Sequence, residues 1–123
     1  TEKQKIPLSF YRTPSGVEPV REFIKRLPTE DRKVLGSDIL AAQWKWPVGM
    51  PLCRPMGAGL YEIRTALPSR RIARTLLIYW QKQLVALHAF IKKTKTTPEA
   101  DLKLARKRQK EIEHEKNKHI GSS

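Results

Sequence analysis

Three consecutive segments in the second half of the chain are rich in β-branched and aromatic residues. They span residues 60–67, 71–80 and 83–93, and only short polar breaks at 68–70 and 81–82 separate them. Segments of this composition, joined by such breaks, predict three consecutive antiparallel strands. The simplest connection between them is a meander.

Alternation within these segments assigns side chains to the two faces of the sheet. In the first segment, period two places Glu62 and Arg64 on one face and Tyr61 on the other. The segment 71–80 is apolar on both faces over its second half, which is typical of a central strand covered on both sides.

Arg74 interrupts the apolar pattern of the central strand, and no acidic residue of that strand can pair with it. A guanidinium stays charged at any working pH and is seldom buried without an anion, so Arg74 either extends to solvent or holds an anion. Arg64 and the lysines that end the third strand would place further cations at the same surface. These lysines are Lys92, Lys93 and Lys95. Such a cluster repels itself unless a polyanion fills it.

The first half of the chain predicts one strand and two helices. Residues 6–11 alternate as a short strand, and apolar residues recur at helical spacing in 17–27 and again in about 30–45. Proline at position 28 ends the first helix, so the two helices form a hairpin that we expect on one face of the sheet. Residues 47–59 are rich in proline and glycine and predict a loop.

A last helix begins near Thr97, with Pro98 at its first position, and frays after Glu115. Its docking stripe is thin and flanked by cations. The stripe consists of Leu102, Ala105, Gln109 and Ile112, and the flanking cations are Lys103, Arg106, Lys107, Arg108 and Lys110. We expect one domain over residues 1–123, with a disordered tail or a remnant at about 119–123.

The chain is strongly basic, with 25 Lys and Arg against 12 Asp and Glu and a formal net charge of +13. Residues 1–53 hold 9 basic and 6 acidic side chains, whereas residues 54–123 hold 16 and 6. The excess belongs to the sheet and the last helix, which points to nucleic acid or another polyanion. The alternative is a basic surface that is merely solvated.

Cysteine and histidine usage excludes several kinds of site. Cys53 is the only cysteine, and the three histidines, His88, His114 and His119, show no ligand spacing. We therefore expect no metal, no small-molecule cofactor and no internal disulfide. No apolar stretch has the length of a membrane span and no leader is evident, so we expect no membrane contact and a cytoplasmic protein.

The predicted order β-α-α-β-β-β-α, an α+β fold, resembles the RelE/HigB superfamily of bacterial toxins, in particular its phage-related HigB-like branch. The resemblance is carried by residues 20–24, 54–64, 71–74 and 90–98. It implies a small cytoplasmic toxin of a type II toxin–antitoxin system that cleaves mRNA, usually in the A site of the 70S ribosome. It also implies an antitoxin with a helix-turn-helix DNA-binding domain.

The same resemblance assigns roles residue by residue. Arg64 and Arg74 fall where the family has cations on its sheet, and Lys92 and Lys93 match a double lysine at the end of the last strand. The chain departs from the pattern next to the Thr-Pro, where Thr96 replaces a common lysine and Lys95 lies one residue earlier. Position 99 carries Glu where some RelE-type toxins have a catalytic tyrosine.

RNA chemistry suggests what such cations do. The 2′-hydroxyl is the nucleophile, so an enzyme aligns it, removes its proton and stabilises the transition-state charge. Arg64 and Arg74 would hold phosphate oxygens, and Lys93 or Lys95, with a pKa lowered by neighbouring cations, would accept the proton. Glu62 is a competing base, although an ion pair with Arg64 is the more common arrangement.

Further residues are candidates for RNA contact. Lys92, Arg71 and Arg106 offer cations for phosphate, and Tyr61 offers a ring for stacking, although such a tyrosine is more often packed in a core.

Two other classes of function stay open. A ParE-type relative poisons DNA gyrase by protein contact and needs no cation cluster, and a basic binding module would bind nucleic acid without cleaving it. Convergence of Arg64, Arg74 and residues 92–95 in space would distinguish the nuclease from the gyrase poison.

Overall fold

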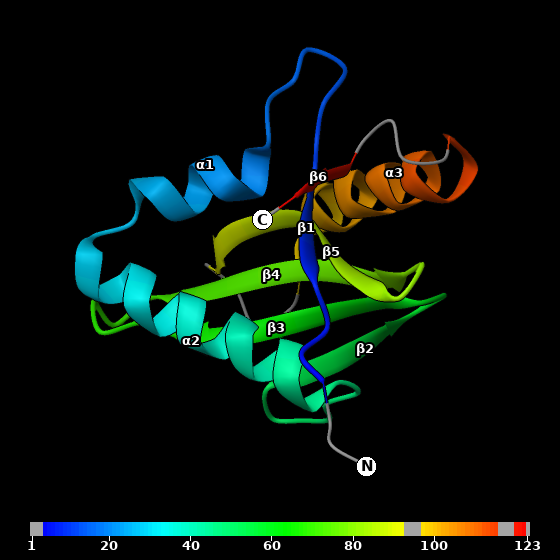
Figure 1. The fold of residues 1–123 in the computed structure, drawn as a ribbon. Coiled ribbons are helices and arrows are strands. Elements are labelled where there is room, and N and C mark those ends of the chain that lie inside the picture. Colours follow the sequence, from blue (N-terminus) through cyan, green and yellow to red (C-terminus); the bar gives the residue numbers. More distant parts are fainter. Residues whose placement is uncertain (1–3, 93–96, 116–119, 123) are drawn as a thin grey trace.

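A computed structural model describes residues 4–92, 97–115 and 120–122 of the chain. Within these residues, six strands form one sheet in the order β2-β3-β4-β5-β1-β6 (Figure 1). The strands are β1 (Leu8–Tyr11), β2 (Cys53–Gly57), β3 (Leu60–Ala66), β4 (Ile72–Trp80), β5 (Gln83–Lys92) and β6 (Ile120–Ser122).

The predicted meander is confirmed. β3 pairs antiparallel with β4, and β4 pairs antiparallel with β5. β1 joins the far side of β5 in parallel, and a parallel pair needs a crossover connection. The two helices that follow β1, together with the rest of the meander, make that crossover.

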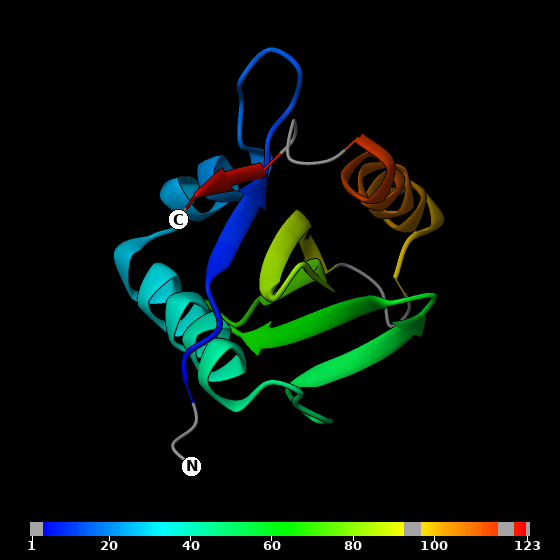
Figure 2. The same cartoon turned by 45° about the vertical axis from the view of Figure 1, so that its right-hand side comes forward.

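The helices lie on both faces of the sheet. α1 (Pro19–Arg26) and α2 (Thr29–Lys45) cover one face as a hairpin, and α3 (Glu99–Glu115) covers the other, as Figure 2 shows. Each face has its own apolar core: Leu35 packs against Leu77 on the hairpin side, and Ile112 packs against Leu76 on the α3 side. The α+β fold expected from the sequence, with a mostly antiparallel sheet, is confirmed.

The stripe predicted for the last helix is also confirmed. Ala105, Gln109 and Ile112 are buried, and Leu102 is partly buried against the same core. The Tyr11 hydroxyl donates to the Glu111 carboxylate, which ties α3 to β1.

Two expectations differ from the structure. The loop predicted over 47–59 contains the edge strand β2, in which Pro55 is tolerated because one side of an edge strand needs no ladder hydrogen bonds. The tail expected to be disordered contains β6, which pairs antiparallel with β1. Among the described residues, no helix has the length and apolar character needed to cross a membrane.

Candidate active site

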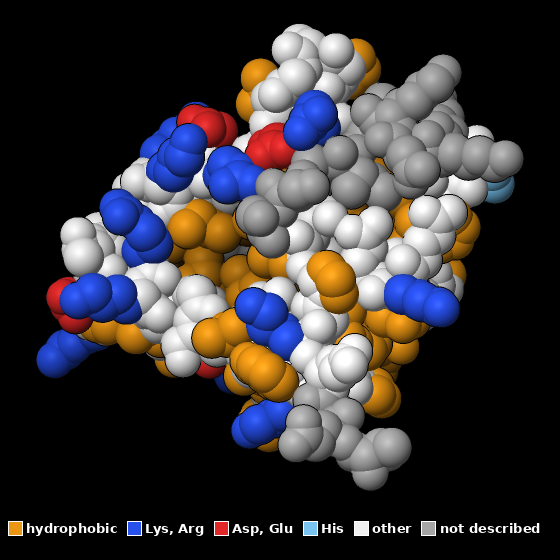
Figure 3. All heavy atoms as spheres, in the orientation of Figure 1, with side chains coloured by type: hydrophobic (Ala, Val, Ile, Leu, Met, Phe, Trp, Pro, Cys, Tyr) orange, Lys and Arg blue, Asp and Glu red, His pale blue; other side chains and the backbone are white. Residues whose placement is uncertain are grey.

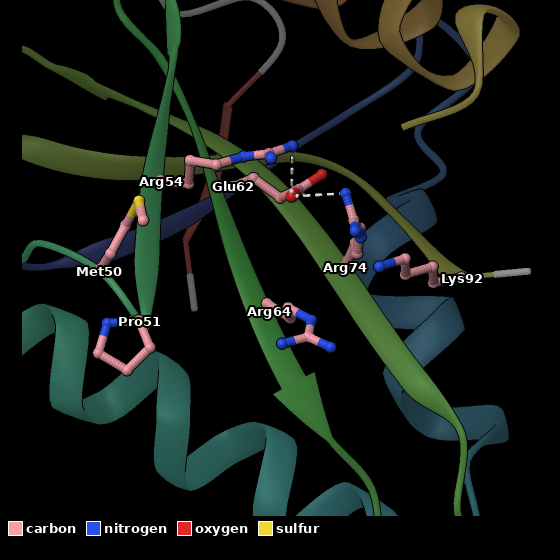
Figure 4. Close-up of a pocket in the computed structure, with 7 residues that line it drawn as sticks. All are labelled: Met50, Pro51, Arg54, Glu62, Arg64, Arg74 and Lys92. Carbon is pink, nitrogen blue, oxygen red and sulfur yellow. Dashed lines mark hydrogen bonds and ion pairs between the residues drawn. The ribbon is translucent and has the colours of Figure 1, made fainter. Parts of the chain in front are cut away.

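A cavity of about 270 Å³ opens between β2, β3, β4 and the end of β5 (Figure 4). Four of its side chains are cationic, one is a carboxylate and two are apolar. The lining residues are Met50, Pro51, Arg54, Glu62, Arg64, Arg74 and Lys92. Because a single carboxylate faces four cations, the cavity has an excess of positive charge that suits an anion.

Register between β3 and β4 brings the central groups together. Arg64 lies directly opposite Arg74, and Glu62 lies opposite Leu76, two residues along the same face. A diagonal neighbour on one sheet face is within reach of a long side chain. The register therefore places the Glu62 carboxylate beside the Arg74 guanidinium.

Glu62 and Arg74 form a buried ion pair, each with 2% of its surface exposed. Arg74 Nη1 donates to Glu62 Oε1 and to Thr97 Oγ1, both at 2.9 Å, and the Thr97 hydroxyl donates to Glu62 Oε2 at 2.7 Å. Arg54 Nη2 lies 3.5 Å from Glu62 Oε1. Two expectations are therefore wrong: Arg74 has an acidic partner from the neighbouring strand, and Glu62 does not pair with Arg64.

Arg64 and Lys92 are the cations that remain available. Arg64 is exposed and Lys92 is half-buried, and neither has a hydrogen bond or ion pair to any residue that the structure describes. Partial burial lowers the pKa of Lys92, and the positive charges of Arg74 and Arg64 lower it further. These two side chains are thus the ones free to bind a ligand.

A β-bulge in β5 decides which way Lys92 points. Leu76 pairs with His88 but Leu77 pairs with Ala86, so Leu87 is an extra residue on this strand. Leu87 packs in the α3-side core, and the adjacent His88 contacts Asp101 of α3 at 2.6 Å. Since two successive residues face α3, the alternation shifts by one and Lys92 faces the same side as Arg74.

The structure brings Arg64, Arg74 and Lys92 together, but not every candidate. Tyr61 lies on the hairpin face, edge-on to Trp46 with ring centroids 4.9 Å apart. Arg71 pairs with Asp31 at 3.2 Å, near the β3–β4 turn. Neither residue lines the cavity.

Three further candidates lie elsewhere or outside the described residues. Arg106 donates to the carbonyl oxygens of Gly57 and Met56 at 2.7 and 2.8 Å, and so fastens α3 to the β2–β3 turn. Lys93 and Lys95 lie in the segment 93–96, which is outside the described residues.

Sequence reasoning missed four residues of the site. Arg54, Met50 and Pro51 escaped because strand β2 was predicted as loop, and an edge strand containing proline gives little alternation to detect. Thr97 was interpreted only as the start of a helix, although its hydroxyl links Glu62 to Arg74.

Metal ligation was tested in the part of the chain that the structure describes. No group of three or more His, Cys, Asp or Glu side chains is placed there to hold a metal ion.

Comparison with known proteins gives one match. A family model described as "Phage derived protein Gp49-like (DUF891)" matches residues 22–110, which is more than half of the chain and includes all residues of the cavity. No curated protein matches the chain in a sequence search.

Proposed function

The chain belongs to the phage-derived Gp49-like family, which is associated with toxin–antitoxin toxins of the RelE/HigB type, and on this premise we propose that it is a toxin that cleaves mRNA. The proposal places it in the HigB-like branch, with mRNA in the A site of the 70S ribosome as its substrate. Its partner is an antitoxin with a helix-turn-helix DNA-binding domain.

The proposed reaction is an in-line transfer within the RNA. The 2′-oxygen attacks the adjacent phosphorus, the bond from phosphorus to the 5′-oxygen of the next nucleotide breaks, and a cyclic 2′,3′-phosphate and a free 5′-hydroxyl form. A base takes the proton of the 2′-hydroxyl, and an acid protonates the leaving oxygen. The enzyme accelerates this step by positioning the groups and by stabilising the added charge on the phosphoryl oxygens.

Arg64 is the proposed phosphate ligand, because its guanidinium is exposed in the cavity and has no partner among the described residues. A planar guanidinium donates two parallel hydrogen bonds to phosphate oxygens. Arg74 contributes charge from a fixed position, since Glu62 and Thr97 hold its Nη1. Glu62 is thus proposed as the residue that orients Arg74 rather than as a base.

Lys92 is the proposed proton acceptor. Its lowered pKa increases the fraction of neutral amine at a given pH, and only the neutral amine takes a proton. Lys93 and Lys95, which the sequence predicted for this role, remain predictions and are tested beside it.

The observation that carries the proposal is the convergence of Arg64, Arg74 and Lys92 on one cavity. A poison of DNA gyrase that acts through protein contact has no need of cations gathered around a hollow. A module that only binds nucleic acid has no need of a lysine with a lowered pKa. The convergence therefore favours cleavage over both alternatives.

The test is to incubate the purified protein with a defined mRNA in a translating extract and to map the new 5′ ends. We expect discrete ends that carry 5′-hydroxyl groups. Arg64→Ala should lose them, whereas Lys33→Ala, which removes an exposed cation of α2 outside the cavity, should keep them. Intact mRNA after incubation with folded wild-type protein would contradict the proposal.

A further inference from the structure

A second hollow adjoins the cation-lined cavity. It has a volume of about 380 Å³, and its lining combines four apolar residues with one cation and one carboxylate: Val34, Pro51, Leu52, Ala66, Arg64 and Asp38. Pro51 and Arg64 line both hollows, so the two are contiguous. The Arg64 amide donates to the Leu52 carbonyl at 3.1 Å, which holds the 51–52 loop against β3 and fixes the shared wall.

Asp38 is the acidic residue of this hollow, and its situation differs from that of the other acids on α2. Glu30 pairs with Lys33 at 3.7 Å, and Asp31 accepts hydrogen bonds from Ser69 and Arg71. Asp38 is half-buried, yet no residue in the described ranges donates a hydrogen bond to it or forms an ion pair with it.

The absence of a partner for Asp38 is notable in a chain with 25 basic side chains. A half-buried carboxylate keeps its charge at lower cost when a donor satisfies it. Asp38 therefore has both oxygens available to a ligand that supplies N–H groups.

The two hollows match the two ends of one nucleotide. Arg64 and Lys92 in the first hollow suit a phosphate, and the apolar walls of the second suit the flat faces of a base. Arg64 lies at the boundary, where the sugar and the phosphate of the bound nucleotide would meet. A nucleotide next to the scissile phosphate would thus place its base against Asp38.

We propose that Asp38 selects guanine at the nucleotide adjoining the scissile phosphate, an inference that rests on the proposed RNA cleavage. Guanine presents two neighbouring donors, N1–H and the N2 amino group, on its Watson–Crick edge, and a carboxylate accepts both in parallel. Adenine and cytosine present one amino group beside a ring-nitrogen acceptor, and uracil presents one N–H between two carbonyl oxygens. Each of these places an acceptor against the carboxylate.

The experiment compares the bases that flank the mapped cleavage sites for the wild type, Asp38→Ala and Asp38→Asn in the same translating extract. Wild-type sites should be enriched in guanine at one flanking position. Asp38→Ala should lower that enrichment about tenfold, the effect expected for one good bidentate contact. Asp38→Asn should move the preference toward adenine, because an amide offers one donor and one acceptor.

Glu30→Ala is the matched control. It removes one negative charge from the exposed surface of the same helix, outside both hollows, and should keep the wild-type pattern. If the wild type cleaves without a guanine preference, or if Asp38→Ala cleaves with the wild-type pattern, the inference is overturned and the proposed cleavage stands. If the wild type does not cleave, the proposed function falls and the inference falls with it.

Discussion

At the scale of single residues, the two arginines of the cavity have different tasks. Arg74 is buried and held by Glu62, whereas Arg64 on the facing position of β3 is exposed. A buried ion pair is weak evidence of net stabilisation, but removing one partner leaves the other charge uncompensated. Substitutions at the two positions should therefore separate stability from activity.

We predict that Arg64→Ala lowers mRNA cleavage roughly a hundred- to a thousandfold while the urea denaturation midpoint is unchanged. Arg64→Lys should restore only part of the activity, because an ammonium lacks the planar pair of donors. Arg74→Ala should cost about 3–5 kcal/mol of unfolding free energy, since Glu62 is left buried without its main cation. This corrects the expectation that the fold tolerates loss of Arg74. An unchanged midpoint for Arg74→Ala would mean that the ion pair has no role in the fold.

The lowered pKa of Lys92 predicts a pH dependence of cleavage. The neutral amine is the active form, so the cleavage rate should rise with pH and reach half of its maximum below 10.5, the ordinary pKa of lysine. Lys92→Arg keeps the positive charge but cannot give a neutral base in this range, so the rise should disappear. A rise that survives in Lys92→Arg and vanishes in Lys93→Ala or Lys95→Ala would assign the base to one of those lysines instead.

At the scale of elements, periodicity predicts what it can detect. The strands β3, β4 and β5 and the helices α1 and α2 appear close to their expected residues, because long apolar patterns mark them. The cluster of Arg64 and Arg74 follows from alternation within two strands. The β5 bulge that turns Lys92 toward them does not, since one extra residue shifts the alternation and leaves no compositional trace. The Glu62–Arg74 pair depended on the register between strands, which the sequence does not specify.

Docking of α3 also affects the site, because Thr97, just before this helix, bonds to both Glu62 and Arg74. Ile112 is 1% exposed in the α3-side core, whereas Leu102 is only partly buried. We predict that Ile112→Ala lowers the free energy of unfolding by about 2–5 kcal/mol and that Leu102→Ala lowers it less. Urea denaturation of both variants checks the order. Equal midpoints for Ile112→Ala and the wild type would show that α3 does not dock as described.

At the scale of the whole molecule, the charge is unbalanced in every region. Lys and Arg side chains are spread over α1 and α2 with few acidic side chains between them (Figure 3), and the cavity adds a further excess. On α3, Lys103, Lys107 and Lys110 line a groove beside Leu102. Such a surface attracts RNA in general and binds it with an affinity that falls as salt rises. Base selection within the cavity must therefore act on top of a large nonspecific attraction.

The same charge predicts a tight acidic protein partner. A net charge of +13 is unfavourable to leave uncompensated, and an acidic chain that covers it gains fast, electrostatically steered association. Expression of this gene alone should therefore arrest growth, and co-expression of a neighbouring gene for an acidic protein should relieve the arrest. Arg64→Ala should be tolerated without that gene, because it removes the proposed phosphate ligand while leaving most of the basic surface in place. Unimpaired growth during strong expression of folded wild-type protein would contradict the toxin assignment. Arrest by Arg64→Ala at the wild-type level would instead show that the basic surface, and not cleavage, is what harms the cell.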